Sequence, residues 1–268
     1  ILKEVDLNEH ELKVNYNKGN LFIEGNGNVQ FQEKNDKISY SISKNNKKYI
    51  YKSSLIIENN PFILELLNYQ KEKFSQLIID FNATQFLNQK IIFHSILLKE
   101  NQNQIIIKDL ELNKKFKVES IQSAEIKFDD KNRIKNELNL YKKKNYYLLS
   151  GKSFNSDNLI EKMINNESKD SLNFFSKNLK VKLDINKIHL DSEYNVTNLT
   201  GNLNIKNNEI HNANITAQFS KDKRMKFTVS SNENSKITTL FLENAEPIVR
   251  RYKFIKGYED GSLDFYSS

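Results

Sequence analysis

The sequence predicts a mainly β protein: an elongated, curled antiparallel sheet, groove-like in section, of repeated short strands with about three short helices. Apolar and polar residues alternate over most of the chain, as expected where successive side chains point to opposite faces of a sheet. Apolar residues make up only 38% of the 268 residues, below the roughly 45–50% of an average globular domain. Both observations indicate a sheet with one apolar and one wet face.

The clearest strands lie between residues 179 and 229. Four segments alternate there, separated by turn sequences such as Asn207-Asn208 and Lys221-Asp222-Lys223. They predict a meander of four antiparallel strands. The apolar positions are Leu179, Val181, Leu183 and Ile185; then Leu199, Leu203 and Ile205; then Ala213, Ile215, Ala217 and Phe219; and finally Met225, Phe227 and Val229.

The first half repeats this rhythm less regularly, for example on either side of the turn Asn17-Lys18-Gly19-Asn20. We divide the chain into an N-terminal β-repeat region, residues 1–140, and a second β-repeat region, residues 141–268. Because the chain begins with Ile1 rather than Met, we expect a fragment of a longer protein. Further strands are predicted at residues 48–57, 76–82, 90–99, 103–108, 116–128, 134–141 and 145–150.

Three short helices are predicted within this series of strands. Asn60 and Pro61 have the residue types of an N-cap and a first helical position, so the segment up to Leu67 is the first. Ser156 or Asn155 can cap the second, near residues 156–165. The third covers residues 245–254 and begins after Asn244. Such short helices must pack on the sheet to be stable.

The sequence offers no recognisable catalytic, cofactor or metal site. Cysteine is absent, which excludes thiolate chemistry and disulfides. The segment Ser150-Gly151-Lys152-Ser153 lacks the upstream glycine of a phosphate-binding loop. We therefore predict that the chain is not an enzyme and holds no cofactor. None of the four histidines forms a pair with metal-ligand spacing: His10, His94, His189 and His211.

The formal net charge of +7 does not by itself predict nucleic-acid binding. Lysines alternate with apolar residues, as in Lys180-Val181-Lys182-Leu183. This pattern is typical of a solvated sheet face, whereas a nucleic-acid binder concentrates its basic and aromatic residues on one surface. We predict no nucleic-acid partner.

Residues 145–268 contain two segments that are similar to a known family. Asn178–Leu190 runs into Val196-Thr197-Asn198-Leu199-Thr200-Gly201-Asn202-Leu203, an alternating strand followed by a turn and an N-x-x-G-x-L opening. Asn244–Tyr258 precedes a final strand at Gly261–Phe265. A weaker similarity lies in Leu149–Asn155. The chain thereby resembles the AsmA-like superfamily, and within it the YhdP-like, TamB-related proteins of the bacterial envelope. Asn244 and Glu246 depart from the Asp and Gly usual there.

The resemblance implies the periplasmic part of an inner-membrane-anchored bridge protein. Such a protein conducts phospholipids towards the outer membrane along an apolar β-groove. The implied partners are phospholipid acyl chains, the inner membrane through a segment outside this chain, and outer-membrane proteins. This mechanism needs no base, nucleophile or metal.

We predict that the groove is lined by apolar strand positions of the second region. The alternative reading of the same residues is a closed β core in a scaffold or interaction module of the envelope that carries no lipid. The predicted lining residues are Val181, Leu183, Leu203, Ile205, Ile215, Phe219, Phe227 and Val229.

Overall fold

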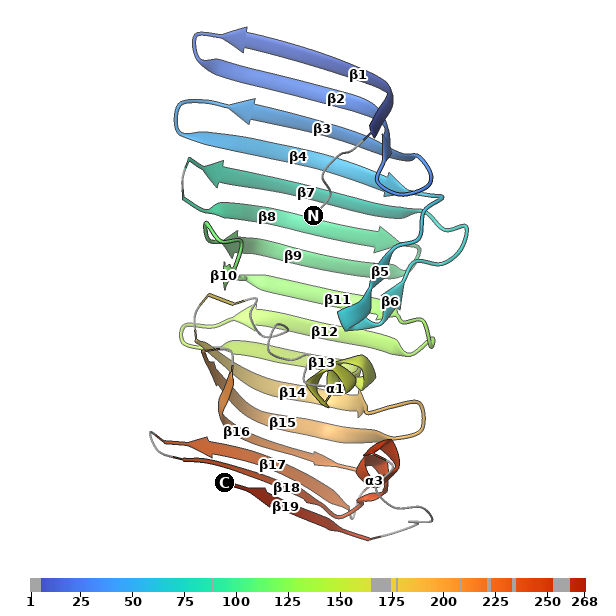
Figure 1. The fold of residues 1–268 in the computed structure, drawn as a ribbon, viewed down its shortest axis with the longest axis vertical. Helices are drawn as coiled ribbons and strands as arrows, with labels where there is room; N and C mark the ends of the chain where they lie inside the picture. Colours follow the sequence, from blue (N-terminus) through green and yellow to red (C-terminus); the bar gives the residue numbers. More distant parts are fainter. Residues whose placement is uncertain are drawn as a thin grey trace. The chain divides into compact units, whose positions relative to one another are not determined.

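A computed structural model describes residues 6–87, 89–164, 175–176, 178–207, 209–220, 223–232, 235–252 and 261–268. Strands account for 68% of the structure, which confirms the mainly β prediction (Figure 1). The chain divides into two compact units, Ile1–Arg133 and Ile134–Ser268. The sequence-based division fell after residue 140, within a strand of the second unit.

Unit 1 is an open antiparallel sheet. Its strands pair in the order β1-β2-β3-β4-β7-β8-β9, and β9 also pairs with β10 and β11. Each strand is joined to the next by a short turn, except between β4 and β7. The strands are β1 (Asp6–Asn17), β2 (Asn20–Gln30), β3 (Asp36–Lys44), β4 (Lys48–Ile57), β7 (Leu77–Phe86), β8 (Ile91–Glu100), β9 (Asn103–Leu112), β10 (Val118–Ser120) and β11 (Ser123–Asp129).

Unit 2 is an open sheet in which the strands follow one another in chain order from β12 to β19. The predicted meander is confirmed as β14 to β17. One pair, β13 and β14, is parallel, so the prediction of an antiparallel sheet throughout is wrong and the sheet is mixed. The strands are β12 (Lys135–Lys142), β13 (Tyr147–Asn155), β14 (Leu179–His189), β15 (Asn195–Lys206), β16 (Glu209–Gln218), β17 (Arg224–Ser231), β18 (Lys236–Leu242) and β19 (Leu263–Ser267).

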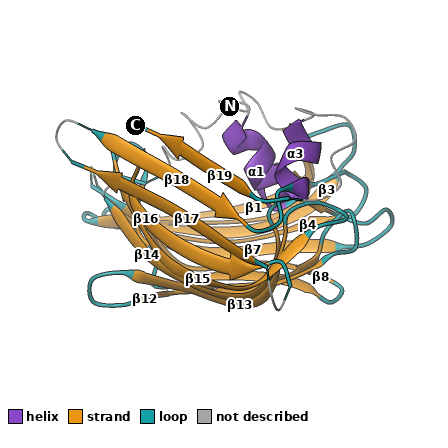
Figure 2. Cartoon of the chain, turned by 90° about the horizontal axis from the view of Figure 1, so that it is seen from below, coloured by secondary structure: helices purple, strands orange, loops and turns teal. Residues whose placement is uncertain are grey.

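The parallel pair follows from the connection between its strands. A hairpin turn would make the two strands antiparallel, whereas a parallel pair needs a longer connection that returns the chain to the end of the sheet where the first strand begins. This connection contains the helix α1 (Asp157–Ile164). The second helix, α3 (Glu246–Tyr252), lies between β18 and β19. In Figure 2 both helices lie on the same side of the strands of unit 2.

Two α-helices are present in the described part of the chain, against the three predicted. The segment after Pro61 is instead the short strand β5 (Ile63–Leu64), the 3-10 turn η1 (Glu65–Leu67) and the strand β6 (Tyr69–Gln70). The expected cap, Asn60, bonds elsewhere: its Oδ1 accepts from the Lys34 N–H at 3.1 Å, and its Nδ2 donates to Asp36 Oδ2 at 2.7 Å. With its side chain used by the β2–β3 connection, Asn60 cannot cap a helix.

The other two predicted helices exist with shifted ends. Asn155 Oδ1 accepts from the Asp157 N–H at the start of α1, at 3.1 Å, while the Ser156 hydroxyl donates to the His189 carbonyl. The Ser156 carbonyl accepts from the Ile160 N–H at 2.8 Å, so Ser156 stands at the N-cap position and the Asn155 side chain accepts from the first helical residue. Helix α3 begins at Glu246, and the Ala245 carbonyl accepts from Ile248 and Val249. Residues 165, 253 and 254 lie outside the described residues.

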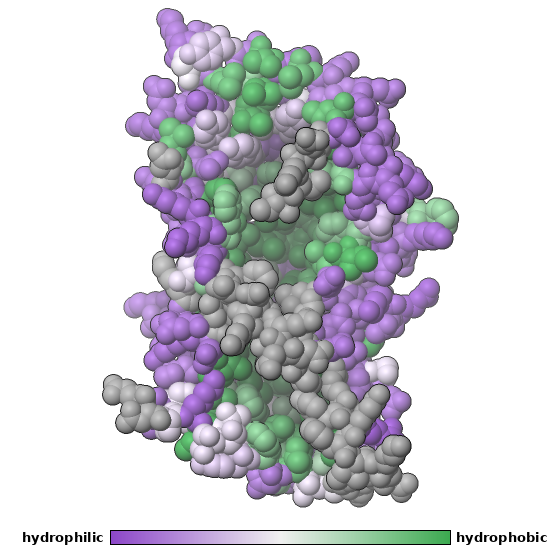
Figure 3. Space-filling model, viewed as in Figure 1, coloured by the Kyte–Doolittle hydropathy of each residue, from purple (hydrophilic) through white to green (hydrophobic). Residues whose placement is uncertain are grey.

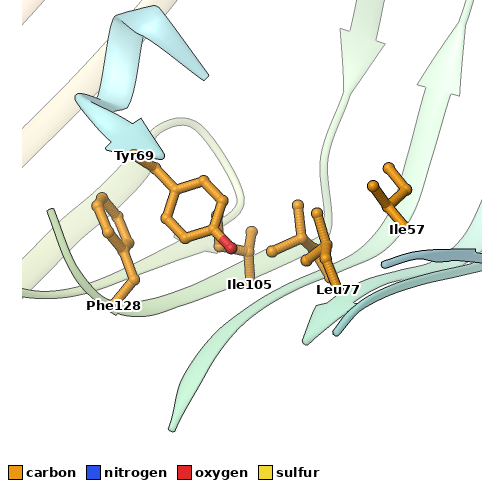
Figure 4. Close-up of a cluster of buried hydrophobic side chains, with 6 residues drawn as sticks. Ile57, Tyr69, Leu77, Ile105 and Phe128 are labelled. Atoms are coloured by element: carbon orange, nitrogen blue, oxygen red, sulfur yellow. The ribbon is translucent and has the colours of Figure 1, made fainter. Parts of the chain in front are cut away.

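The β5–β6 ribbon packs on one end of the unit 1 sheet and closes a small core there (Figure 4). Tyr69 is fully buried, with its ring edge-on to Phe128 at 5.5 Å between centroids. Its hydroxyl donates to Glu100 Oε2 at 2.6 Å. Glu100 is also fully buried, and its Oε1 accepts from the Glu72 N–H and the Ser75 hydroxyl. The core comprises Ile57, Tyr69, Leu77, Leu98, Ile105 and Phe128.

Burial, and secondarily the hydrogen bond to Glu100, raise the pKa of Tyr69. Below about pH 10 the hydroxyl is neutral in the folded and unfolded chain, so this shift leaves stability unchanged there. Above about pH 10 the unfolded chain ionises first, and unit 1 loses stability. We expect the urea midpoint to fall more steeply between about pH 9 and pH 11 in wild type than in Tyr69→Phe. Equal falls in the two proteins would contradict this assignment.

Candidate functional site

A continuous row of residues crosses the middle of the unit 2 sheet on one face. Directly paired residues of neighbouring strands point to the same side, so the register can be followed from β12 to β19. Seven of the eight positions are apolar side chains and the eighth is glycine. In order, the row is Leu140, Leu149, Leu183, Gly201, Ile215, Phe227, Leu240 and Phe265.

Seven of the eight predicted lining residues lie on this face, here called the apolar face of unit 2. Leu183, Ile215 and Phe227 belong to the central row itself. Val181, Leu203 and Val229 belong to the adjacent row, together with Ala213, and Ile205 is paired with Leu179. Phe219 follows the last residue of β16, so it is placed in a turn and not in a strand. Val181 and Val229 are buried; the other six are half-buried.

The reverse face of unit 2 is polar along the corresponding row. Thr200 and Thr216 are opposite each other, with their hydroxyl oxygens 3.2 Å apart. Apart from Phe241 in β18, the side chains of this row are polar or charged, which keeps the face in water. The row is Asn139, Ser150, Asp184, Thr200, Thr216, Lys226, Phe241 and Asp264.

Both helices are attached to unit 2 near one end of its strands. Arg250 of α3 forms ion pairs with Glu193 of the β14–β15 turn at 3.0 Å and with Glu246 at 3.1 Å. Its guanidinium also lies over the Tyr194 ring. The Ser156 hydroxyl ties the start of α1 to His189 at the end of β14. Ala245 and Val249 are buried, so α3 covers part of the sheet at this end.

Unit 1 has an equivalent apolar face, none of whose residues is among the predicted lining residues. Its rows appear only once the strand register is known, because Ser53, Gln85 and Lys44 interrupt the alternation in the sequence. One row, paired across six strands, is entirely aliphatic: Ile38, Leu55, Ile79, Leu98, Ile105 and Ile126. A second runs Val14, Ile23, Ile42, Tyr51, Ala83, Phe93 and Leu110.

The two ends of the unit 1 strands differ in how far this face is covered. The β5–β6 ribbon covers the end where β4 finishes and β7 begins, at Ile57 and Leu77. Towards the other end, Tyr51, Phe93 and Leu110 are half-buried. Burial raises the pKa of Tyr51, whose hydroxyl donates to Gln85 at 2.8 Å. Figure 3 shows apolar residues along the middle of this face, with hydrophilic residues at its edges.

One series of neighbouring side chains has the residue types of a catalytic triad. His94 Nε2 lies 3.0 Å from Thr84 Oγ1, and His94 Nδ1 lies 3.6 Å from Asp109 Oδ1. Thr84 is buried, and β7 is paired on both sides, so its backbone N–H groups are used in the sheet instead of forming an oxyanion hole. We assign no catalytic role to this series. Among the described residues no three His, Cys, Asp or Glu side chains group as metal ligands.

Comparisons with known proteins place the chain in no family: no family model, curated protein or solved structure matches it. Membership of the AsmA-like superfamily therefore stays a prediction. In the described ranges, no helix combines the length and apolar character needed to span a membrane.

Proposed function

We propose that this chain is a segment of a periplasm-spanning, inner-membrane-anchored bridge protein that conducts phospholipids along an apolar β-groove towards the outer membrane. The observation that supports this most is the apolar row that crosses all eight strands of unit 2, on an open sheet with a polar reverse face. In this proposal the sheet is elongated and curled, and its apolar face is the lining of the groove.

The energetics of acyl-chain burial favour such a surface. Each methylene removed from water contributes about 0.8 kcal/mol, so ten half-covered methylenes contribute about 4 kcal/mol. An uninterrupted row offers nearly equal affinity at neighbouring positions, so a chain can move along it without a large barrier. The charged head group stays in water at the edge of the sheet, where it keeps its solvation.

A second candidate is a scaffold or interaction module with a closed β core. Two observations favour this function: the cluster of buried side chains around Tyr69 in unit 1, and the packing of α3 over part of the sheet in unit 2. The two functions differ in one property: a conduit takes up lipid while folded, and a closed core does not.

Lipid binding by the purified chain tests the proposal. We expect native mass spectrometry, followed by lipid extraction, to find near-stoichiometric phospholipid on the wild-type chain expressed in bacteria. In Leu183→Asp/Ile215→Asp, two carboxylates on the apolar face should lower occupancy at least about tenfold, or 1.4 kcal/mol.

The matched control adds the same charge to the reverse face. Asn202→Asp/Thr216→Asp places carboxylates opposite Lys182 and Lys226, so it should fold and retain lipid. Circular dichroism checks that each variant keeps its β structure, and Ile215→Thr, which is milder, replaces the double variant if that one unfolds. A folded wild-type chain that takes up no lipid from vesicles would favour the closed scaffold.

A further inference from the structure

The two ends of the unit 1 strands carry different charges. The turns β1–β2, β3–β4, β7–β8 and β9–β10 lie at one end and form what we call the lysine rim: residues 17–20, 44–48, 86–91 and 112–118. These segments contain eight lysines and no Asp or Glu, and one of the lysines, Lys90, is ion-paired with Glu111 near the end of β9 at 2.7 Å. The opposite rim, residues 31–36, 58–76, 100–103 and 129–133, contains eight carboxylates and five basic residues. The eight lysines of the lysine rim are Lys18, Lys44, Lys47, Lys48, Lys90, Lys114, Lys115 and Lys117.

Two turns of the lysine rim are built in the same way. Asn45 Oδ1 accepts from the N–H groups of Lys47 and Lys48, at 2.9 and 3.0 Å. Asn113 Oδ1 accepts from the N–H groups of Lys115 and Lys117, at 2.8 and 3.1 Å. Each asparagine thereby fixes the backbone that carries a pair of lysines. Of the eight lysines, the exposed ones are Lys18, Lys47, Lys114 and Lys115.

The lysine rim borders the less covered half of the apolar face of unit 1. The β5–β6 ribbon packs at the opposite rim, over Ile57, Leu77 and Leu98. The pair Phe93–Leu110 lies two residue pairs from the lysine turns, and the pair Tyr51–Ala83 lies three residue pairs from them. An amphiphile on this half of the face would therefore have its polar end at the lysines.

We infer that the lysine rim binds the head-group phosphates of the lipid cargo and selects anionic phospholipids. This inference rests on the proposed function, to which it adds the class of lipid. Lysine is a point-charge phosphate ligand, and each one near an anionic lipid surface contributes favourably. Neighbouring turns of one rim are two strand spacings apart, about 10 Å, so successive turns can each serve one head group. The apolar face beside the rim favours a lipid over a nucleic acid.

A competition between two lipids tests the selection. The full chain is incubated with vesicles of equal phosphatidylglycerol and phosphatidylethanolamine, and the bound lipids are quantified by extraction and mass spectrometry. We expect phosphatidylglycerol to be enriched about fivefold or more. Neutralising the exposed lysines in Lys18→Gln/Lys47→Gln/Lys114→Gln/Lys115→Gln should abolish the enrichment while the total bound lipid stays similar.

The opposite rim supplies a control with the same change in net charge. Lys34, Lys73, Lys131 and Arg133 are exposed there, and the variant with Gln at all four positions should keep the enrichment. Loss of enrichment in both variants would assign it to net charge and overturn the inference, as would a wild-type chain that binds both lipids equally.

Two further outcomes would also overturn the inference. Glycerol 3-phosphate binding as tightly as the lipid would make the rim a site for soluble phosphate, and tighter binding of duplex DNA than of the vesicles would make it a nucleic-acid site. A chain that binds no lipid at all rejects the proposed function as well, which distinguishes that failure from loss of selectivity alone.

Discussion

Replacing Tyr69 by alanine is expected to destabilise unit 1 by about 3–5 kcal/mol, the range for removing a large aromatic side chain from a core. The ring is fully buried against Phe128 and Phe62, and it is the largest fully buried side chain of the ribbon that covers this end of the sheet. The substitution also removes a hydrogen-bond donor from the buried Glu100 carboxylate, and a buried charge with fewer partners is costly.

Tyr69→Phe separates the two contributions because it keeps the ring and removes the hydroxyl. We expect it to cost about 1–2 kcal/mol. Urea unfolding followed by circular dichroism measures both variants, and hydrogen exchange shows whether the loss is confined to unit 1. An unchanged midpoint for Tyr69→Ala would mean that the ribbon contributes nothing to the stability of the sheet.

Gly201→Ala is expected to destabilise unit 2 by about 2–4 kcal/mol, which is at or above the usual range for overpacking. Gly201→Val should destabilise it by more, because its side chain is larger. A Cβ at this position would meet the Asn214 carbonyl oxygen and would lie 2.8 Å from Ile215 Cα. Both are backbone atoms of the paired strand β16, so the clash can be removed only if β15 and β16 move apart. The register between these strands already shifts nearby, between Thr197 and Thr200.

The neighbouring position on the reverse face provides the control. Asn202 is exposed, and Asn202→Thr should change the free energy of unfolding by no more than about 0.5 kcal/mol. Thermal unfolding compares the two, and hydrogen exchange in β15 and β16 localises the effect. If Gly201→Ala is as stable as wild type, the close approach of the two strands is not a constraint.

The sequence predicted the strands of unit 2 well because period-two alternation is local. Lys180 to Ile185 alternate without interruption, and the register then follows from the turns. The helix predicted after Pro61 failed because the Asn60 side chain bonds to Lys34 and Asp36, far away in the sequence. Propensity and capping rules contain no information about such contacts.

The same limit applies to the candidate site. Seven of the predicted lining residues share one face because strand alternation alone places them there. The apolar face of unit 1 could not be predicted with equal clarity, since irregularities in pairing at Asn82/Ala83 and Asn8/Glu11 shift which residues share a face. The lysine rim was also missed, because its lysines come from four turns that only the strand pairing brings to one end of the sheet.

The parallel pair β13–β14 has a consequence for how unit 2 folds. Hairpins such as β14–β15 close over short turns, so their contacts are local and form quickly. Pairing β13 with β14 instead requires residues 156–178 to close a longer loop, which costs more chain entropy before any contact is gained. Formation of this pair is therefore the expected slow step, in which the β12–β13 hairpin joins a meander that is already assembled.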